Sequence, residues 1–175
     1  NGYLSGYWQC EKYFKEFRAE LLELFRFPQN QINEASRKMQ DQICREQAVA
    51  VHVRRGDYLL PENNRKYGNI CTLQYYRNAM QYMKEKVSDA RFYFFSNDPE
   101  WVRENLSEGD SVIVNCNHGK ENYLDMYLMS QCSHNIIANS SFSWWGAWLN
   151  RNPDKIIVSP KRWFSHLDVS DAVCE

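Results

Sequence analysis

Short apolar runs that alternate with longer helical stretches are the feature that most constrains how this sequence folds. Each run is only a few residues long and is bounded by polar or turn-forming residues. Strands of this kind, separated by helices, pair in parallel through right-handed crossovers. The sequence therefore predicts an α/β fold, a Rossmann-like parallel sheet with flanking helices. The predicted strands are 48–53, 91–96, 111–114, 135–138 and 155–159.

The predicted helices fill the intervals between these strands. In the first of them, several large apolar side chains are spaced along one helical face. Thr72 and Asp98 are expected to cap helices, with Pro99 in the first turn of the second one. The polar stretch 61–69 is predicted to be a loop. The helices are expected at 9–27, 31–46, from Thr72 to about Val87, from Asp98 onward, at 121–132 and at 142–150, and the apolar face of the first consists of Phe14, Phe17, Leu21, Leu22 and Phe25.

Charge and hydropathy exclude several classes of protein. The 21 basic and 22 acidic side chains nearly cancel, so no global field attracts nucleic acid or an anionic membrane, and an anion site has to be local. No apolar run approaches the roughly 18 to 20 residues needed to cross a bilayer. The six cysteines are scattered without metal-ligand spacing, which indicates free thiols, no zinc site and a reducing compartment.

The strongest local signal is the segment HVRRGDY, residues 52–58. Because side chains alternate along a strand, His52 and Arg54 are expected to line one crevice. A guanidinium group can hold two phosphate oxygens at once, which suits a diphosphate. Two alternatives remain open: Arg54 and Arg55 form structural ion pairs with Asp57 and other carboxylates, or the Arg-Gly-Asp triplet is displayed for cell adhesion.

A second signal is ANSSFSWWGAW, residues 138–148, where a predicted strand leads into a helix that begins with serines. Unpaired backbone N–H groups and hydroxyls at a helix N-terminus favour an anion. Ser140 and Ser141 are therefore candidate phosphate ligands, although they could simply cap the helix. The tryptophans of this segment are expected to fill the core.

Two carboxylates complete the candidate set. Asp98 follows the strand 91–96, and Asp125 lies on the helix after Glu121. A carboxylate can accept paired hydrogen bonds from a guanine edge or from ribose hydroxyls. The simpler interpretation makes Asp98 a helix cap and Asp125 an exposed helix residue. The glycine-rich, P-loop, zinc-protease, serine-hydrolase and DxD signatures are all absent from the sequence.

Together, HVRRGDY, YFFSNDPEW and YLDMYLMSQCSHNIIANSSFSWWGAWLN resemble the three motif blocks of the bacterial and animal α-1,2-fucosyltransferases. GYWQCEKYF is similar to the segment that precedes the first block in that family. The resemblance implies the donor-binding lobe of a two-lobed GT-B-type enzyme. Such an enzyme transfers L-fucose from GDP-fucose to the 2-hydroxyl of a galactoside acceptor, with inversion and without an obligatory metal or other cofactor.

The resemblance also implies roles for individual residues. Arg54 would hold the β-phosphate, while Arg55 and Asp57 would order the loop. The guanosine would be bound by His52, Asp98 and Asp125, and the diphosphate by Ser140 and Ser141. Glu62 is the candidate general base, with Asp57 as its competitor and an ordinary solvated residue as the simpler interpretation of Glu62.

The family's glycine-rich GGLGNQ-type segment has no counterpart here, so we expect this chain to be the donor-binding part of a longer protein. Residues 1–46 are predicted to be a helical segment that leads into the donor lobe, and 47–175 the GDP-fucose-binding domain. A non-catalytic sugar-nucleotide-binding domain is the alternative. We expect a cytoplasmic location for a bacterial protein, with peripheral membrane association left open, and a Golgi location for an animal one.

Overall fold

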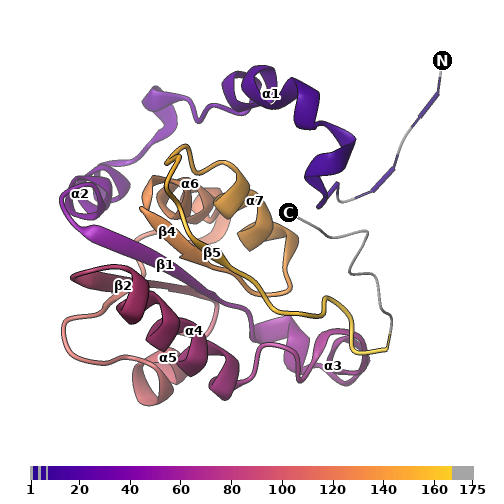
Figure 1. Cartoon of the computed structure of the whole chain (residues 1–175), viewed down its shortest axis with the longest axis vertical. Helices are drawn as coiled ribbons and strands as arrows, with labels where there is room; N and C mark the ends of the chain where they lie inside the picture. The colour runs from indigo at the N-terminus through magenta and orange to yellow at the C-terminus, as the bar shows by residue number, and fades with distance from the viewer. Residues whose placement is uncertain (1, 4, 7, 167–175) are drawn as a thin grey trace.

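The computed structural model describes residues 2–3, 5–6 and 8–166 and is built around a five-stranded parallel sheet (Figure 1). The order of strands across the sheet is β3-β2-β1-β4-β5. The prediction of an α/β, Rossmann-like arrangement is therefore confirmed. The strands are β1 (Gln47–Val53), β2 (Ala90–Ser96), β3 (Val112–Val114), β4 (His134–Ile136) and β5 (Ile157–Val158).

The first strand of the chain is the middle strand of the sheet. After its first residue every side chain of β1 is buried, as expected for a parallel strand covered on both faces. It pairs with β2 from Gln47 to Val53 and with β4 through Val49, Ala50 and Val51. The sheet grows from β1 to β3 on one side and then from β4 to β5 on the other. This reversal creates a topological switch point between β1 and β4, and ligands of such sheets bind beyond the carboxyl ends of the strands at that point.

Helices cover both faces of the sheet (Figure 1). The valines of β1 face α4 (Leu73–Lys86) and α5 (Pro99–Asn105) in one apolar core. Its alanines face α2 (Glu34–Ile43) and α6 (Tyr123–Gln131) in the other. Next to α6 lies α7 (Ser141–Trp148), whose Gly146 leaves room for Met129: a Cβ atom at Gly146 would lie 2.9 Å from the Met129 Cε atom.

The two predicted caps are present. Thr72 Oγ1 accepts a hydrogen bond from the Tyr75 N–H at 3.2 Å, which closes the first turn of α4. Asp98 Oδ1 accepts one from the Trp101 N–H, also at 3.2 Å, and Pro99 begins α5. The helix after β2 therefore starts where the sequence predicts it.

The segment 61–69 is not the predicted loop, because Pro61–Tyr67 form a helix, α3. Pro61 lies in its first turn together with Glu62, and both residue types favour a helix N-terminus. None of the residues of α3 is buried. The prediction failed because a short helix without a buried apolar face leaves no helical spacing of apolar residues in the sequence.

The predicted helix 9–27 is interrupted. It consists of two 3₁₀ turns, Glu11–Tyr13 and Lys15–Phe17, followed by α1 (Arg18–Leu24). The helix breaks at Phe14, whose φ of −147° is not helical and whose ring stacks on Trp145 at 5.8 Å between centroids. The predicted apolar face is therefore split: Phe14, Leu21 and Leu22 pack against the α7 region, whereas Phe17 is 59% exposed. Phe25 is 44% exposed and contacts the Trp145 ring edge-on, at 5.7 Å between centroids.

Smaller elements and boundaries complete the fold. The second predicted helix begins at Glu34, after the 3₁₀ turn Gln29–Gln31, and 3₁₀ turns also cover Gly56–Leu59 and Gly119–Glu121. Cys44, Cys71, Cys116 and Cys132 are free thiols, as predicted, and Cys174 lies outside the described residues. Within the described part of the chain, no helix combines the length and apolarity needed to cross a membrane.

Candidate functional site

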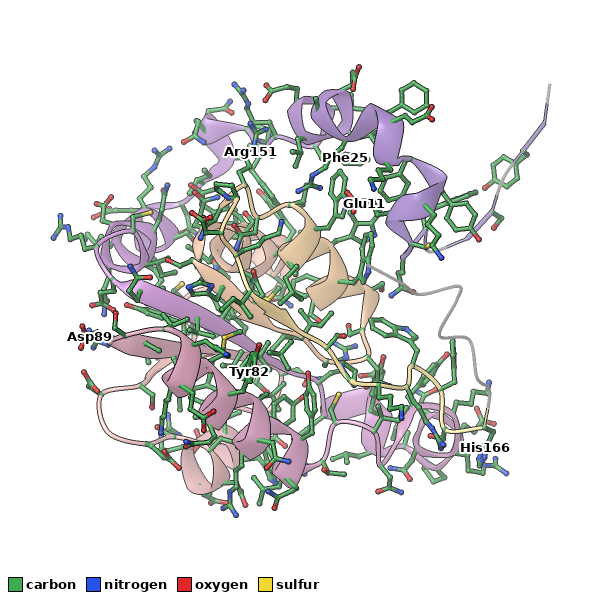
Figure 2. The ribbon with its side chains drawn as sticks, in the orientation of Figure 1. Glu11, Phe25, Tyr82, Asp89, Arg151 and His166 are labelled. Carbon is green, nitrogen blue, oxygen red and sulfur yellow. The ribbon has the colours of Figure 1, made fainter. Side chains whose placement is uncertain are left out.

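The candidate site lies at the carboxyl edge of the sheet. Asp89 precedes β2 and marks the amino edge, whereas His166 lies on the opposite side of the molecule, near α3 (Figure 2). The loop after β1 emerges at the carboxyl edge, where β4 also ends next to the start of α7. The switch point therefore coincides with the HVRRGDY segment.

His52 is the last buried polar residue of β1. Its side chain is 5% exposed, and its ring lies 5.6 Å from the ring of Phe142, between centroids. Burial, assisted by the nearby Arg54 charge, lowers the pKa of His52 to about 3, so the imidazole is neutral. Its Nδ1 atom is buried without a hydrogen-bond partner among the described residues. A bound ligand or water would satisfy this atom.

Arg54 follows on the same side of the strand. Its Nη2 atom lies 2.9 Å from Asp57 Oδ1, and about a third of its side chain, 34%, remains exposed. Its Cζ atom lies 5.7 Å from the centre of the Tyr58 ring. One ion pair does not use all five donors of a guanidinium group, so Arg54 keeps donors for an anion.

The Arg55 side chain does not line a space next to His52; it contacts other residues of the chain instead. Its Nε atom donates to Asp98 Oδ2 at 3.0 Å, and its Cζ atom lies 4.1 Å from the centre of the Trp101 ring. Its backbone N–H donates to Asn97 Oδ1 at 3.0 Å. A Cβ atom at Gly56 would lie only 2.1 Å from Asn97 Nδ2, which explains the glycine. Arg55 therefore fixes the loop to α5, as the structural alternative predicts.

A pocket of about 400 Å³ opens beside Arg54 at the carboxyl ends of β1, β2 and β3. It brings together three of the predicted site residues, His52, Arg54 and Asp125. We call it the edge pocket. The rest of its lining is Phe95, Ser96, Asn97, Pro99, Val114, Asn115, Asn117, His118, Gly119, Asn122 and Phe142.

Asp125 is held in the edge pocket by an ordered network. Asn117 Nδ2 donates to Asp125 Oδ1 at 2.9 Å, and Asn117 Oδ1 in turn accepts from Ser36 Oγ at 2.8 Å. Burial raises the pKa of Asp125 to about 6, although the Asn117 hydrogen bond and the His118 charge act in the opposite direction. Asp125 is therefore no ordinary exposed helix residue. It is a partly buried carboxylate that is orientated from α2.

The N-terminus of α7 adjoins the edge pocket through Phe142. Ser140 occupies the N-cap position but makes no side-chain capping bond, and Ser143 Oγ instead donates to the Ala138 carbonyl at 3.1 Å. The first N–H groups of the helix have no partner within the helix. Trp144 and Trp148 are buried in the core, as predicted, whereas Trp145, for which the same was expected, is half-buried against it.

The other predicted residues do not line the edge pocket. Asp57 and Asp98 are engaged with Arg54 and Arg55, so neither end of the Arg-Gly-Asp triplet is displayed for adhesion. Glu62 is exposed in the first turn of α3. Ser140 is buried and Ser141 half-buried beside the pocket rather than in its wall.

Sequence reasoning missed one wall of the edge pocket, which Asn115, Asn117, His118 and Asn122 form. The signal was present, because this polar run follows β3 just as the recognised polar clusters follow β1, β2 and β4. All these strands end at the same edge of a parallel sheet. If the sequence had also been searched for polar residues directly after β3, this wall would have been identified.

The edge pocket combines a permanent cation, a carboxylate and a neutral imidazole next to a helix N-terminus. This set suits a ligand that has an anionic group at one end and N–H or O–H donors at the other. Among residues 2–3, 5–6 and 8–166, no three His, Cys, Asp or Glu side chains gather closely enough to hold a metal ion.

Comparison with known proteins gives the family. Residues 1–170 match the sequence profile of glycosyl transferase family 11. The chain belongs to glycosyl transferase family 11. An α-1,2-colitosyltransferase of Escherichia coli is 39% identical to this family 11 chain over 94% of the chain and 57% of the relative.

Two further relatives of the family 11 chain are informative. The O-antigen biosynthesis glycosyltransferase WbnK of Escherichia coli is 34% identical over 94% of the chain and 56% of its own length. The galactoside α-(1,2)-fucosyltransferase 1 of Ateles belzebuth is 37% identical over 58% of the chain and 28% of its own length. The family 11 chain thus spans little more than half the length of the bacterial relatives and less of the animal one.

Proposed function

We propose that this chain is the donor-binding part of an inverting α-1,2-fucosyltransferase that uses GDP-fucose and a galactoside acceptor. One observation carries the proposal: His52, Arg54 and Asp125 line a single pocket at the carboxyl edge of a parallel sheet. The family and its fucosyl- and colitosyl-transferring relatives support it.

The donor would lie across the edge pocket. Asp125 would accept hydrogen bonds from the N–H groups of the guanine edge, and the buried Nδ1 atom of His52 would find its missing partner in the nucleoside. Arg54 and the N-terminus of α7 would hold the diphosphate. Arg55 and Asp98 would not contact the donor but would hold the loop that carries Arg54.

The reaction would replace one C–O bond with another. The 2-hydroxyl oxygen of the galactoside attacks C1 of fucose from the face opposite GDP. The bond between C1 and the β-phosphate oxygen breaks, GDP leaves with the electron pair, and a base takes the hydroxyl proton. Arg54 would stabilise the negative charge that grows on the diphosphate.

Glu62 remains our proposed base, with Asp57 as the competitor. Glu62 is exposed and lies outside the edge pocket. The base takes the proton of the acceptor hydroxyl, so it has to contact the acceptor and not the nucleoside of the donor. In the longer protein that this proposal implies, Glu62→Gln should abolish most turnover and leave donor affinity unchanged. Full turnover by Glu62→Gln together with inactivity of Asp57→Asn would transfer the role to Asp57.

Calorimetric titration of this chain with GDP and GDP-fucose tests the proposal, with UDP and ADP as controls. We expect saturable binding that is selective for guanosine. If neither guanosine ligand binds to this chain or to the longer protein, the proposal is wrong. Turnover by the longer protein separates an enzyme from a non-catalytic binding domain, and turnover in excess EDTA tests the proposed independence from metal.

A colitosyl donor is the second candidate, because the colitosyltransferase matches 94% of the chain whereas the animal fucosyltransferase matches 58%. Parallel assays of the longer protein with GDP-fucose and with the corresponding colitose nucleotide distinguish the two. The donor with the higher kcat/KM identifies the transferred sugar.

A further inference from the structure

A second hollow, of about 240 Å³, lies on the other side of Arg54. It is formed by the loop after β1, by α3 and by the start of α4, and we call it the outer hollow. Its lining includes Val53 and Tyr76, which belong to the core on the α4 face of the sheet. The edge pocket is lined instead by Phe95 and Val114, from the core on the α6 face. Arg54 lines both spaces and separates them.

The wall of the outer hollow is fixed by contacts within the chain. Tyr58 stacks on Tyr67 with ring centroids 5.0 Å apart, and its hydroxyl donates to the Asn139 carbonyl at 2.9 Å. Asn139 Nδ2 donates to the Tyr67 carbonyl at 3.1 Å. Asn64, on α3, donates to the Tyr58 carbonyl at 3.3 Å. Because both sides of the aromatic pair are tied down, the hollow exists before any ligand binds.

We infer that the outer hollow is the subsite for the glycosyl group of the donor, a 6-deoxyhexosyl unit. The inference rests on the proposed function, since a sugar nucleotide carries its sugar on the β-phosphate. With the nucleoside in the edge pocket and the β-phosphate at Arg54, the sugar continues to the far side of Arg54. The outer hollow is a space that Arg54 lines there.

The size and lining of the outer hollow match one sugar ring. Its volume is below the roughly 300 Å³ at which pockets for drug-sized ligands begin. Leu59 and Leu73, neither of which is buried, offer apolar contact to the methyl group of a 6-deoxy sugar.

The outer hollow offers polar groups to the sugar hydroxyls, and Thr72 and Asn64 are two of them. Thr72 Oγ1 already accepts a bond from the Tyr75 N–H, so its own proton is left to donate. Asn64 uses its amide nitrogen toward Tyr58, which leaves its carbonyl oxygen to accept. None of the residues described in the lining is acidic, so the space beside the diphosphate is free of repelling charge.

Leu59 allows a test that leaves the fold intact. It lines the outer hollow and is 52% exposed, so Leu59→Trp should narrow the hollow without disturbing the core. Leu60 is the matched control, because it is 58% exposed and does not line the hollow. Each variant and the wild-type chain would be titrated with GDP and with GDP-fucose, and thermal unfolding would verify the fold.

We expect Leu59→Trp to weaken GDP-fucose binding by about fivefold to tenfold while GDP affinity stays within about twofold. Leu60→Trp should change neither. Equal losses for both ligands, no loss for either, or a loss confined to the acceptor KM of the longer protein would overturn the sugar subsite. Failure of the wild-type chain and the longer protein to bind GDP would instead defeat the proposed function itself.

Discussion

The two sides of the loop after β1 differ in how their arginines are used. On one side, Arg55 is bound by a carboxylate, an indole ring and the Asn97 amide, all from the chain itself. On the other, Arg54 has one partly exposed ion pair and lines both the edge pocket and the outer hollow. Adjacent residues of the same type thus have different tasks: one holds the loop in place and the other remains available to a ligand.

Arg54→Ala tests the available side and should have the largest effect. It removes a charge-assisted hydrogen bond to the donor of about 1.5 to 3 kcal/mol, so donor affinity should fall roughly tenfold to a hundredfold. The melting temperature should hardly change, because the ion pair between Arg54 and Asp57 is partly exposed and stabilises the fold only weakly. Calorimetry with GDP measures the change in affinity, and Arg54→Lys should recover part of it. Unchanged GDP binding in Arg54→Ala would contradict the assignment.

Asp125→Asn tests the ligand-binding side of the loop through the pH dependence of donor affinity. The raised pKa of about 6 means that wild-type affinity for GDP-fucose should be constant above neutrality and fall up to about tenfold per unit below pH 6. The variant should bind about tenfold more weakly at pH 8 and lose this pH dependence. The other ionisable groups lining the edge pocket are His52, Arg54 and His118, so the difference between wild type and variant isolates Asp125.

The free energy of unfolding should also depend on the protonation of Asp125, but in the opposite direction: it should fall as pH rises, whereas donor affinity should rise. The folded-state pKa of Asp125 lies above the ordinary 3.8, so the folded protein takes up this proton more readily than the unfolded chain. The contribution of Asp125 to stability is fully present below the ordinary value and is lost as pH rises through about 6. Denaturant unfolding of wild type and Asp125→Asn across this range measures the difference. A carboxylate that titrates normally would give parallel curves.

Gly56→Ala tests the side that holds the loop. The added Cβ would lie 2.1 Å from Asn97 Nδ2 and force that side chain away from the Arg55 N–H. Losing this hydrogen bond should cost about 1 kcal/mol of stability, together with a few-fold loss of GDP affinity as Arg54 loses its fixed position. Gly109→Ala is the matched comparison for the added Cβ, since nothing lies within 4 Å of it, although its φ of 55° adds strain of its own. If Gly56→Ala binds GDP like the wild type, Arg54 is not positioned through Asn97.

The smallest effect is expected at the ion pair between Arg55 and Asp98. Both side chains are about a quarter to a third exposed, 26% and 31%, so the coupling energy should be about 0.5 to 1 kcal/mol. A double-mutant cycle of Arg55→Ala and Asp98→Ala, followed by denaturant unfolding, measures it. Because Asp98 also caps α5, its single substitution should cost more than the coupling alone. A coupling energy near zero would leave Trp101 and Asn97 as the main anchors of Arg55.

The sequence predicted those parts of the fold whose pattern is periodic. The buried runs of β1 and β2, the cap at Thr72 and the cap at Asp98 were all identifiable. Alternation along β1 also predicted that His52 and Arg54 share a crevice, and both line the edge pocket. These features depend on neighbouring residues and so leave a local signal.

The remaining features depend on contacts between distant parts of the chain. The break at Phe14 follows from its packing against Trp145, and the carboxyl of Asp125 is orientated through Asn117 from α2. The different roles of Arg54 and Arg55 depend on where α5 begins relative to the loop. No local pattern distinguishes two adjacent arginines, which explains why the sequence left both interpretations open.

The central position of β1 also has a consequence for synthesis of the chain. This strand is made first, yet β4, its partner on one side, comes after β2 and β3 have been added. During translation one edge of a mostly apolar strand therefore stays unpaired until β2, β3 and the helices between them have been made. Such long-range parallel pairing folds slowly and exposes a strand edge to other chains. The most vulnerable moment for aggregation comes before residues 134–136 have left the ribosome.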